Sequence, residues 1–228
     1  MAQEDDLYEA EERLRTAFDE GAMLDLRTNP SSDDIPPDDP SVSSRERQIS
    51  AKVIAELLLS NTQGADRQIR RLHLVGARIT GRLDLRYARI LCPIIIERCF
   101  FEEPVDLSHA QTGLISLEGC RVRSVTGYAL RVDGDINCTQ LRGGTLDLFG
   151  THISGRLWLS SAQLMTADER WALNAPEVTI EGGMYCDNGF KAIGGVNLFC
   201  ASIGSTLEFN NAILINKGGL ALRAQALR

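Results

Sequence analysis

Pairs of apolar residues two positions apart recur at a fixed spacing along this chain. From Leu72 onward the second pair of each block follows the first by five residues, and the next block begins six residues later. Residues two apart face the same side of an extended strand, so each pair points two side chains inward and leaves the residue between them outside. The first four blocks are Leu72/Leu74 with Ala77/Ile79, Leu83/Leu85 with Ala88/Ile90, Ile94/Ile96 with Cys99/Phe101, and Val105/Leu107 with Ala110/Thr112.

This pattern predicts a parallel β-solenoid. Four sides of five or six residues close a coil of about 22 residues, and such coils stack about 4.8 Å apart, as the strands of a parallel sheet do. Small residues that alternate with Leu or Ile suit a narrow interior. The residues predicted to point outward are mostly charged: Arg78, Asp84, Arg89, Asp106, Gln111 and Arg121.

Longer-range self-similarity favours the same fold. Residues 146–164 match residues 196–214 at a constant offset of fifty. A β-sandwich also has frequent turns, but it does not explain an offset kept over so many positions. A further element, Tyr128-Ala-Leu130, returns as Trp171-Ala-Leu173 and, without its aromatic residue, as Leu220-Ala-Leu222. We therefore expect the winding to be interrupted near 123–135 and 165–183.

The sequence before the repeats predicts an acidic helix, a linker and a cap. Residues 4–20 have a thin apolar stripe at helical spacing, and Gly21 is suited to end the helix. Residues 28–42 contain four prolines and predict an extended or disordered linker. Ser43 and Glu46 fit a capping box for a second helix that ends near Asn61 and covers the first coil. The predicted divisions are 1–42 (acidic helix and disordered linker), 43–65 (capping helix) and 66–228 (all-β solenoid).

Charge is divided unevenly along the chain. The net charge is −7, but residues 1–40 hold thirteen acids and three arginines, which leaves +3 for the rest. We expect residues 1–42 to be mobile or weakly docked, held to the basic first coils mainly by screened charge attraction. Limited proteolysis should then cut first within 28–42.

The five-residue steps with Ala or Cys two positions before Leu, Ile or Phe resemble those of the pentapeptide-repeat proteins. They include Ala77/Ile79, Ala88/Ile90, Cys99/Phe101 and Cys120/Val122. The resemblance covers about residues 72–222 and implies a right-handed, quadrilateral β-helix. The segments ARITGRLDL and SGRLWLSSAQL are more similar to the sequences of long actinobacterial repeat proteins, some of which are labelled membrane-associated oxidoreductases. Those repeats continue further, so we expect this chain to be a fragment or a truncated relative.

No motif in the sequence predicts a chemistry. None of the six cysteines forms a CxxC pair or has zinc-finger spacing with a histidine, which favours small buried side chains. We expect His73, His109 and His152 to face solvent without stacking on one another. No phosphate loop, Rossmann fingerprint or hydrolase motif occurs, so we expect no cofactor and no catalytic residue.

The first coils offer a candidate interaction surface instead. Asp84 and Asp106 hold the same position in successive predicted coils and should stack on one face, where they could share a cation or have raised pKa values. The alternative is that Arg82 and Arg86 neutralise them. The candidate surface consists of Arg78, Arg82, Arg86, Arg89, Asp84 and Asp106.

These observations predict a non-enzymatic scaffold that binds a protein of unknown identity. The alternatives are a membrane-associated oxidoreductase component, by resemblance alone, and a DNA mimic like the gyrase-binding pentapeptide-repeat proteins. Mimicry and nucleic-acid binding are disfavoured because the repeats are nearly neutral. With neither a leader nor a membrane span in the sequence, we expect a soluble, cytoplasmic chain, with membrane contact only if the natural protein is longer. The last coil lacks a cap, so we expect end-to-end dimers or a longer protein whose next coils cover it.

Overall fold

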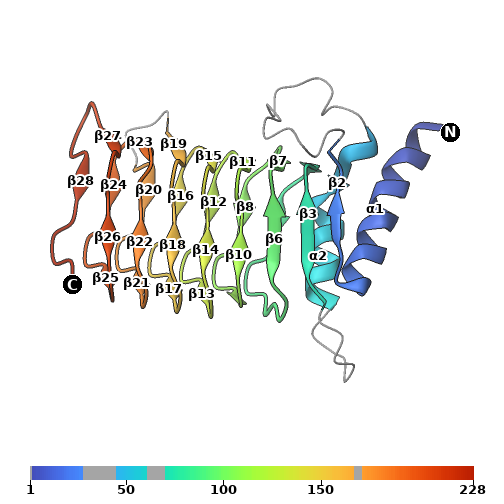
Figure 1. Cartoon of the computed structure of the whole chain (residues 1–228), viewed down its shortest axis with the longest axis horizontal. Helices are drawn as coiled ribbons and strands as arrows, with labels where there is room; N and C mark the ends of the chain where they lie inside the picture. Colours follow the sequence, from blue (N-terminus) through green and yellow to red (C-terminus); the bar gives the residue numbers. More distant parts are fainter. Residues whose placement is uncertain (1, 28–44, 61–69, 167–170) are drawn as a thin grey trace.

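The computed structural model describes residues 2–27, 45–60, 70–166 and 171–228. Parallel strands stack into a solenoid of about seven turns, and two α-helices lie at its N-terminal end (Figure 1). The helices are α1 (Ala2–Glu20) and α2 (Ala51–Ser60), and a short 3-10 turn, η2 (Arg45–Arg47), precedes α2.

The strands form four parallel sheets, one on each side of the coil. Sheet A contains β1 (Met23–Asp25), β3 (Leu72–Val75), β6 (Ile94–Glu97), β10 (Ile115–Ser116), β14 (Ile136–Asn137), β18 (Leu157–Trp158), β22 (Met184–Tyr185) and β26 (Leu207–Glu208). Sheet B contains β2 (Gln48–Ser50), β4 (Arg78–Thr80), β7 (Phe100–Phe101), β11 (Arg121–Val122), β15 (Arg142–Gly143), β19 (Gln163–Met165), β23 (Lys191–Ile193) and β27 (Ile213–Ile215).

The other two sheets begin one or two coils later. Sheet C contains β5 (Leu83–Asp84), β8 (Val105–Asp106), β12 (Val125–Thr126), β16 (Leu146–Asp147), β20 (Leu173–Asn174), β24 (Val196–Asn197) and β28 (Leu222–Arg223). Sheet D contains β9 (Gln111–Thr112), β13 (Arg131–Val132), β17 (His152–Ile153), β21 (Thr179–Ile180) and β25 (Ser202–Ile203).

The predicted inward pairs form the core. Leu72 pairs with Ile94 and Leu83 with Val105, so each residue lies beside its counterpart in the next predicted coil. Every residue of the eight predicted pairs is at most 8 % exposed. The predicted solenoid and its register in the first coils are therefore confirmed.

One of the two predicted interruptions is wrong. Pairing of Val125 with Leu146 and of Arg131 with His152 carries the winding through 123–135 without a break. The second holds only as a lengthening of one coil. Leu146 pairs with Leu173 and His152 with Thr179, so the winding continues, but the step along the chain is longer than in the preceding coil because additional residues lie between β19 and β20. Trp171 and Leu220 do occupy equivalent places, since Leu173 and Leu222 both align with Val196.

Helix α1 is held mainly by apolar packing. Ala10, Leu14 and Phe18 are each 1 % exposed and belong to the same core as the coils. Gly21 has a φ of 64° and donates to the Phe18 carbonyl, so it ends the helix as predicted. Strand β1 then joins sheet A, with Leu24 beside Leu74. The expectation that this part of residues 1–42 is weakly docked is therefore wrong, while residues 28–44 lie outside the described residues.

The second helix begins later than predicted. Ile49, expected on the helix, lies in β2 beside Ile79 of β4 and is completely buried. The helix starts at Ala51, and its buried face packs against β5, so it covers the first coil as expected. The reason for the shift is that the open edge of sheet B offers Gln48–Ser50 a backbone partner, which a helix beginning at Ser43 could not use. The domain boundaries themselves stay a prediction.

Candidate interaction surface

Four of the six predicted surface residues lie together. Arg82, Asp84, Arg86 and Asp106 border β5 and β8 on sheet C. Arg78 lies on sheet B, where its Nη2 is 2.5 Å from Oε1 of Glu102. Arg89 lies on the side of sheet D, where it forms a bridge with Gln111.

The two stacked aspartates are paired with arginines. This is the second of the two alternatives from the sequence, in which Arg82 and Arg86 neutralise them. Asp84 and Asp106 are direct partners in the register. Arg86 Nη2 donates to Asp84 Oδ2 at 2.6 Å, and Arg82 Nη2 donates to Asp106 Oδ2 at 2.6 Å. Asp106 was expected to point into solvent, but it is only 8 % exposed because Arg82, Arg86 and Ser108 surround it.

These contacts determine the protonation of both carboxyl groups. The hydrogen bond from Arg86 lowers the pKa of Asp84 to about 2. Burial raises the pKa of Asp106, but hydrogen bonds from Ser108 and Arg82 outweigh it, and the pKa lies below its ordinary value. The alternative of raised pKa values at this pair is therefore wrong, and both groups are ionised at neutral pH.

The same row of sheet C continues as a ladder of acidic and amide side chains. Asn174 donates to Asp147 at 3.1 Å, and Asn197 donates to Asn174 at 2.9 Å. Asp147 also accepts a hydrogen bond from the backbone N–H of Phe149, two residues later. Asp84, Asp106 and Asn197 accept the same type of bond. This arrangement is an Asx turn, so the row helps to form the corner that follows each strand of sheet C.

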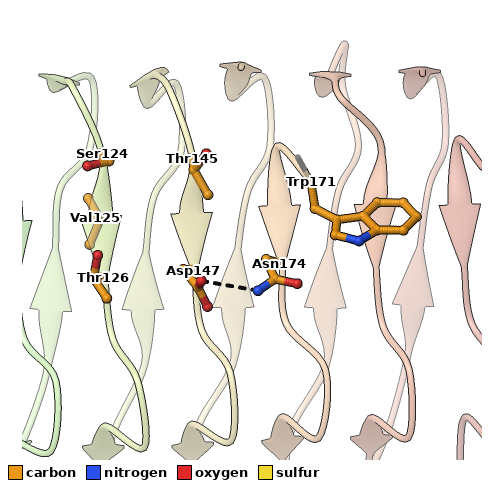
Figure 2. Close-up of a pocket in the computed structure, with 7 residues that line it drawn as sticks. All are labelled: Ser124, Val125, Thr126, Thr145, Asp147, Trp171 and Asn174. Carbon is orange, nitrogen blue, oxygen red and sulfur yellow. Dashed lines mark hydrogen bonds between the residues drawn. The ribbon is translucent and has the colours of Figure 1, made fainter. Parts of the chain in front are cut away.

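A polar pocket of about 540 Å³ lies over the middle of this row (Figure 2). Its lining residues are Ser124, Val125, Thr126, Thr145, Asp147, Trp171 and Asn174. Figure 2 shows the indole of Trp171 extending away from Ser124 and Thr145, toward the later coils. The pocket has one ionisable side chain, Asp147, and that carboxylate is already used by Asn174 and the Phe149 backbone. Its hydroxyl and amide groups can bind polar atoms of a ligand or partner, but they provide no base beside a nucleophile.

An aromatic ladder lies at the corner between sheets C and D, and the sequence did not reveal it. Tyr87 stacks on His109 with ring centres 4.8 Å apart, and Tyr128 stacks on Phe149 at 5.0 Å. His109 meets Tyr128 edge to face at 5.3 Å, so the four rings form one row. Tyr87 is 75 % exposed and Tyr128 is 45 % exposed. His109 is exposed, as expected, and its ring lies between two tyrosines: it stacks on Tyr87 and meets Tyr128 edge to face.

The other two histidines and the cysteines show no arrangement that suggests a reactive site. His73 is half-buried and not solvent-facing, since Met23 of β1 and Ile95 of β6 flank it in sheet A. His152 lies 3.2 Å from Glu181. Five of the cysteines are buried as predicted, and Cys200 is exposed against the prediction. Burial raises the pKa of Cys120, and that of Cys138 to about 12, which leaves little of the reactive thiolate at neutral pH.

Two other features are absent from the part of the chain that the structure describes. No group of three or more His, Cys, Asp or Glu side chains in the described ranges is arranged to hold a metal ion. None of the helices in those ranges is both long and apolar enough to cross a membrane.

Comparisons with known proteins give this chain no relative. The sequence matches no family of proteins, no curated protein and no solved structure.

Proposed function

We propose that this chain is a non-enzymatic scaffold, similar to pentapeptide-repeat solenoids, that binds a protein partner at one corner. The exposed aromatic ladder is the observation that carries the proposal. Aromatic and arginine side chains are the types most enriched at the centres of protein interfaces. The corner surface, as we define it, consists of Tyr87, His109, Tyr128, Phe149, Arg86 and Arg89.

The arrangement of this corner supports binding over a purely structural role. A purely structural ladder does not need exposed rings, because stacking stabilises the solenoid whether or not the rings contact solvent. Tyr87, at the end of the row, is nevertheless 75 % exposed. Arg86 and Arg89 lie on either side of Tyr87 in the sequence. A rigid row of rings loses little conformational entropy when a partner binds. DNA mimicry is the weaker proposal because residues 41–228 carry +3, and no observation on the described residues favours a redox component.

Replacement of the ladder should release the partner. The native protein should capture its partner from an extract of its host. We expect the double variant Tyr87→Ala with Tyr128→Ala to capture at least about tenfold less of that partner, because each ring can be a hot spot. Quantitative mass spectrometry of the captured proteins measures this. Leu91→Ala is the matched control, since Leu91 is 61 % exposed and lies outside the ladder. If both variants keep the same captured proteins as the native chain, the corner is not the binding surface.

We also propose that two copies associate end to end through the last coil. Strands β25, β26, β27 and β28 each lie at the edge of their sheets, with backbone groups available for pairing. The inward column Leu173, Val196, Leu222 shows the change in exposure along the solenoid. The first two are completely buried, and Leu222 is 41 % exposed. Ile213 and Leu220 are 48 % and 56 % exposed at the same end.

Light scattering over a range of concentrations should detect this association. We expect the native chain to form dimers and the double variant Ile213→Lys with Leu222→Lys to remain monomeric, because a buried unpaired charge would oppose stacking. A native chain that stays monomeric at high concentration, with its terminal amides protected from hydrogen exchange, would show that this end is already covered.

A further inference from the structure

A groove on sheet B has basic side chains along its lining. It has a volume of about 720 Å³ and crosses β7, β11, β15 and β19. Outward residues of neighbouring strands follow one another across it: Arg121 pairs with Phe100 and with Arg142, and Arg142 pairs with Gln163. Arg123, two residues after Arg121, also lines the groove. Its lining residues therefore include three arginines and, within the described ranges, no acid.

A glycine pair, Gly143-Gly144, interrupts the row of side chains that lines the groove. The register places Gly144 between Arg123 and Met165 on the neighbouring coils. A Cβ atom at Gly144 would lie 2.3 Å from the Arg123 carbonyl oxygen, and one at Gly143 would lie 2.3 Å from the Val122 carbonyl oxygen. The carbonyl oxygens of the preceding coil leave no room for a Cβ atom at either position, so this stretch of the groove has bare backbone beside Arg123.

Two of these arginines differ from those of the first coils. Arg82 and Arg86 are paired with aspartates, and Arg78 with Glu102. Arg123 and Arg142 are exposed, and neither side chain forms an ion pair or hydrogen bond with another residue in the described part of the chain. An anionic ligand can therefore bind these two guanidinium groups without first breaking an ion pair within the protein.

We propose that this groove binds a short, extended, acidic segment of another polypeptide. Carboxylates at alternate positions of an extended chain lie about 6.8 Å apart on one side, and the long side chains of Arg123 and Arg142 can reach both from adjacent coils. Each guanidinium can hold a carboxylate by two parallel hydrogen bonds. Phe100 and Met165, at the two ends of the groove, provide apolar contacts for the residues that flank the acids.

The groove's size favours a peptide over a nucleic acid. Four strands at a spacing of about 4.8 Å span roughly 15 Å, which is the length of about four or five extended residues. A nucleic acid would need a longer basic track than the three arginines of this groove. This site is on a different sheet from the corner surface, so it goes beyond the function proposed above and does not depend on it.

Fluorescence anisotropy with a labelled octapeptide of alternating Glu and Val tests the proposal. We expect saturable binding that weakens markedly between about 50 mM and 500 mM salt, because the arginines are exposed to screening. The double variant Arg123→Glu with Arg142→Glu should bind at least about tenfold more weakly. Gln163→Glu should weaken binding by a smaller factor, since it adds a carboxylate beside Arg142 and leaves the arginines in place.

The matched control is Arg131→Glu with Arg156→Glu, which makes the same change in net charge on the sides of sheets D and A, where both arginines are exposed. It should keep the native affinity within about twofold. If both double variants lost the same affinity for the peptide, the binding would be non-specific charge attraction, and the proposal would be overturned. So would equal binding of the peptide with Gln in place of Glu, or tighter binding of a labelled oligothymidine to the same arginines. Circular dichroism confirms that each variant is folded, and the corner variants should leave this affinity unchanged.

Discussion

The variant Ile90→Lys should lose at least about 3 kcal/mol of its free energy of unfolding, because a buried amine has no partner there. Ile90 is 2 % exposed and lies in the core together with Ala88 and Ala110. The long side chain cannot reach solvent without displacing a neighbouring coil. Urea denaturation followed by circular dichroism measures the loss.

The control for this experiment is the adjacent residue. Arg89 is exposed and points outward, so Arg89→Ser should change the free energy of unfolding by no more than about 0.5 kcal/mol. Equal losses in the two variants would contradict the register that places Ile90 inside and Arg89 outside.

The variant Phe18→Ala should destabilise the protein by about 3–5 kcal/mol, the usual cost of truncating a buried phenylalanine. Phe18 is 1 % exposed, and α1 packs against η2, β1 and β2 at the first coil. Loss of the ring leaves a cavity between the helix and the coil, and the apolar end of the solenoid becomes accessible to water. Chemical denaturation monitored at two wavelengths measures both the loss and any separate unfolding of the cap.

The control is Arg13→Ala on the exposed side of the same helix, which should have little effect. The ion pairs Arg15–Glu56 and Asp19–Arg70 are exposed and contribute little. High salt should therefore leave the amides of α1 protected from hydrogen exchange. Release of the helix by salt alone, with Phe18→Ala silent, would restore the charge-docked tail that the sequence suggested.

The positions that point inward were predictable because strand geometry is local. A residue and its second neighbour share a face in any extended strand, so Leu83 and Leu85 could be assigned to the core without knowledge of the fold. The regular repeat then stacks Asp84 on Asp106, and the nearby arginines Arg82 and Arg86 could be expected to pair with them. These contacts lie within one or two coils, where the repeat determines every neighbour.

The aromatic ladder was not predictable because its third ring leaves the repeated position: His109 follows Tyr87 by 22 residues, but Tyr128 follows His109 by only 19. Tyr87 and His109 have φ values of 60° and 59°, a conformation that residues other than glycine rarely adopt. Their backbone N–H groups donate to Ser108 and Tyr128 on the next coil, so the ladder of hydrogen bonds stabilises the corner. Tyr128 aligns with Ser108 and not with His109, yet its ring meets His109.

The sequence by itself determined the sides of this solenoid, and the tertiary structure decided its corners and its N-terminal end. An apolar stripe on residues 4–20 identified a helix but not its partner, since amphipathic periodicity does not specify the surface that covers it. Strands β1 and β2 have three residues each and no repeat around them, so only the open edges at Leu74 and Ile79 recruit them. The physical difference is the range of the interactions. The alternation of inward and outward side chains follows from the local backbone of each strand. Capping, corner stacking and the basic groove depend on which coils are neighbours in space.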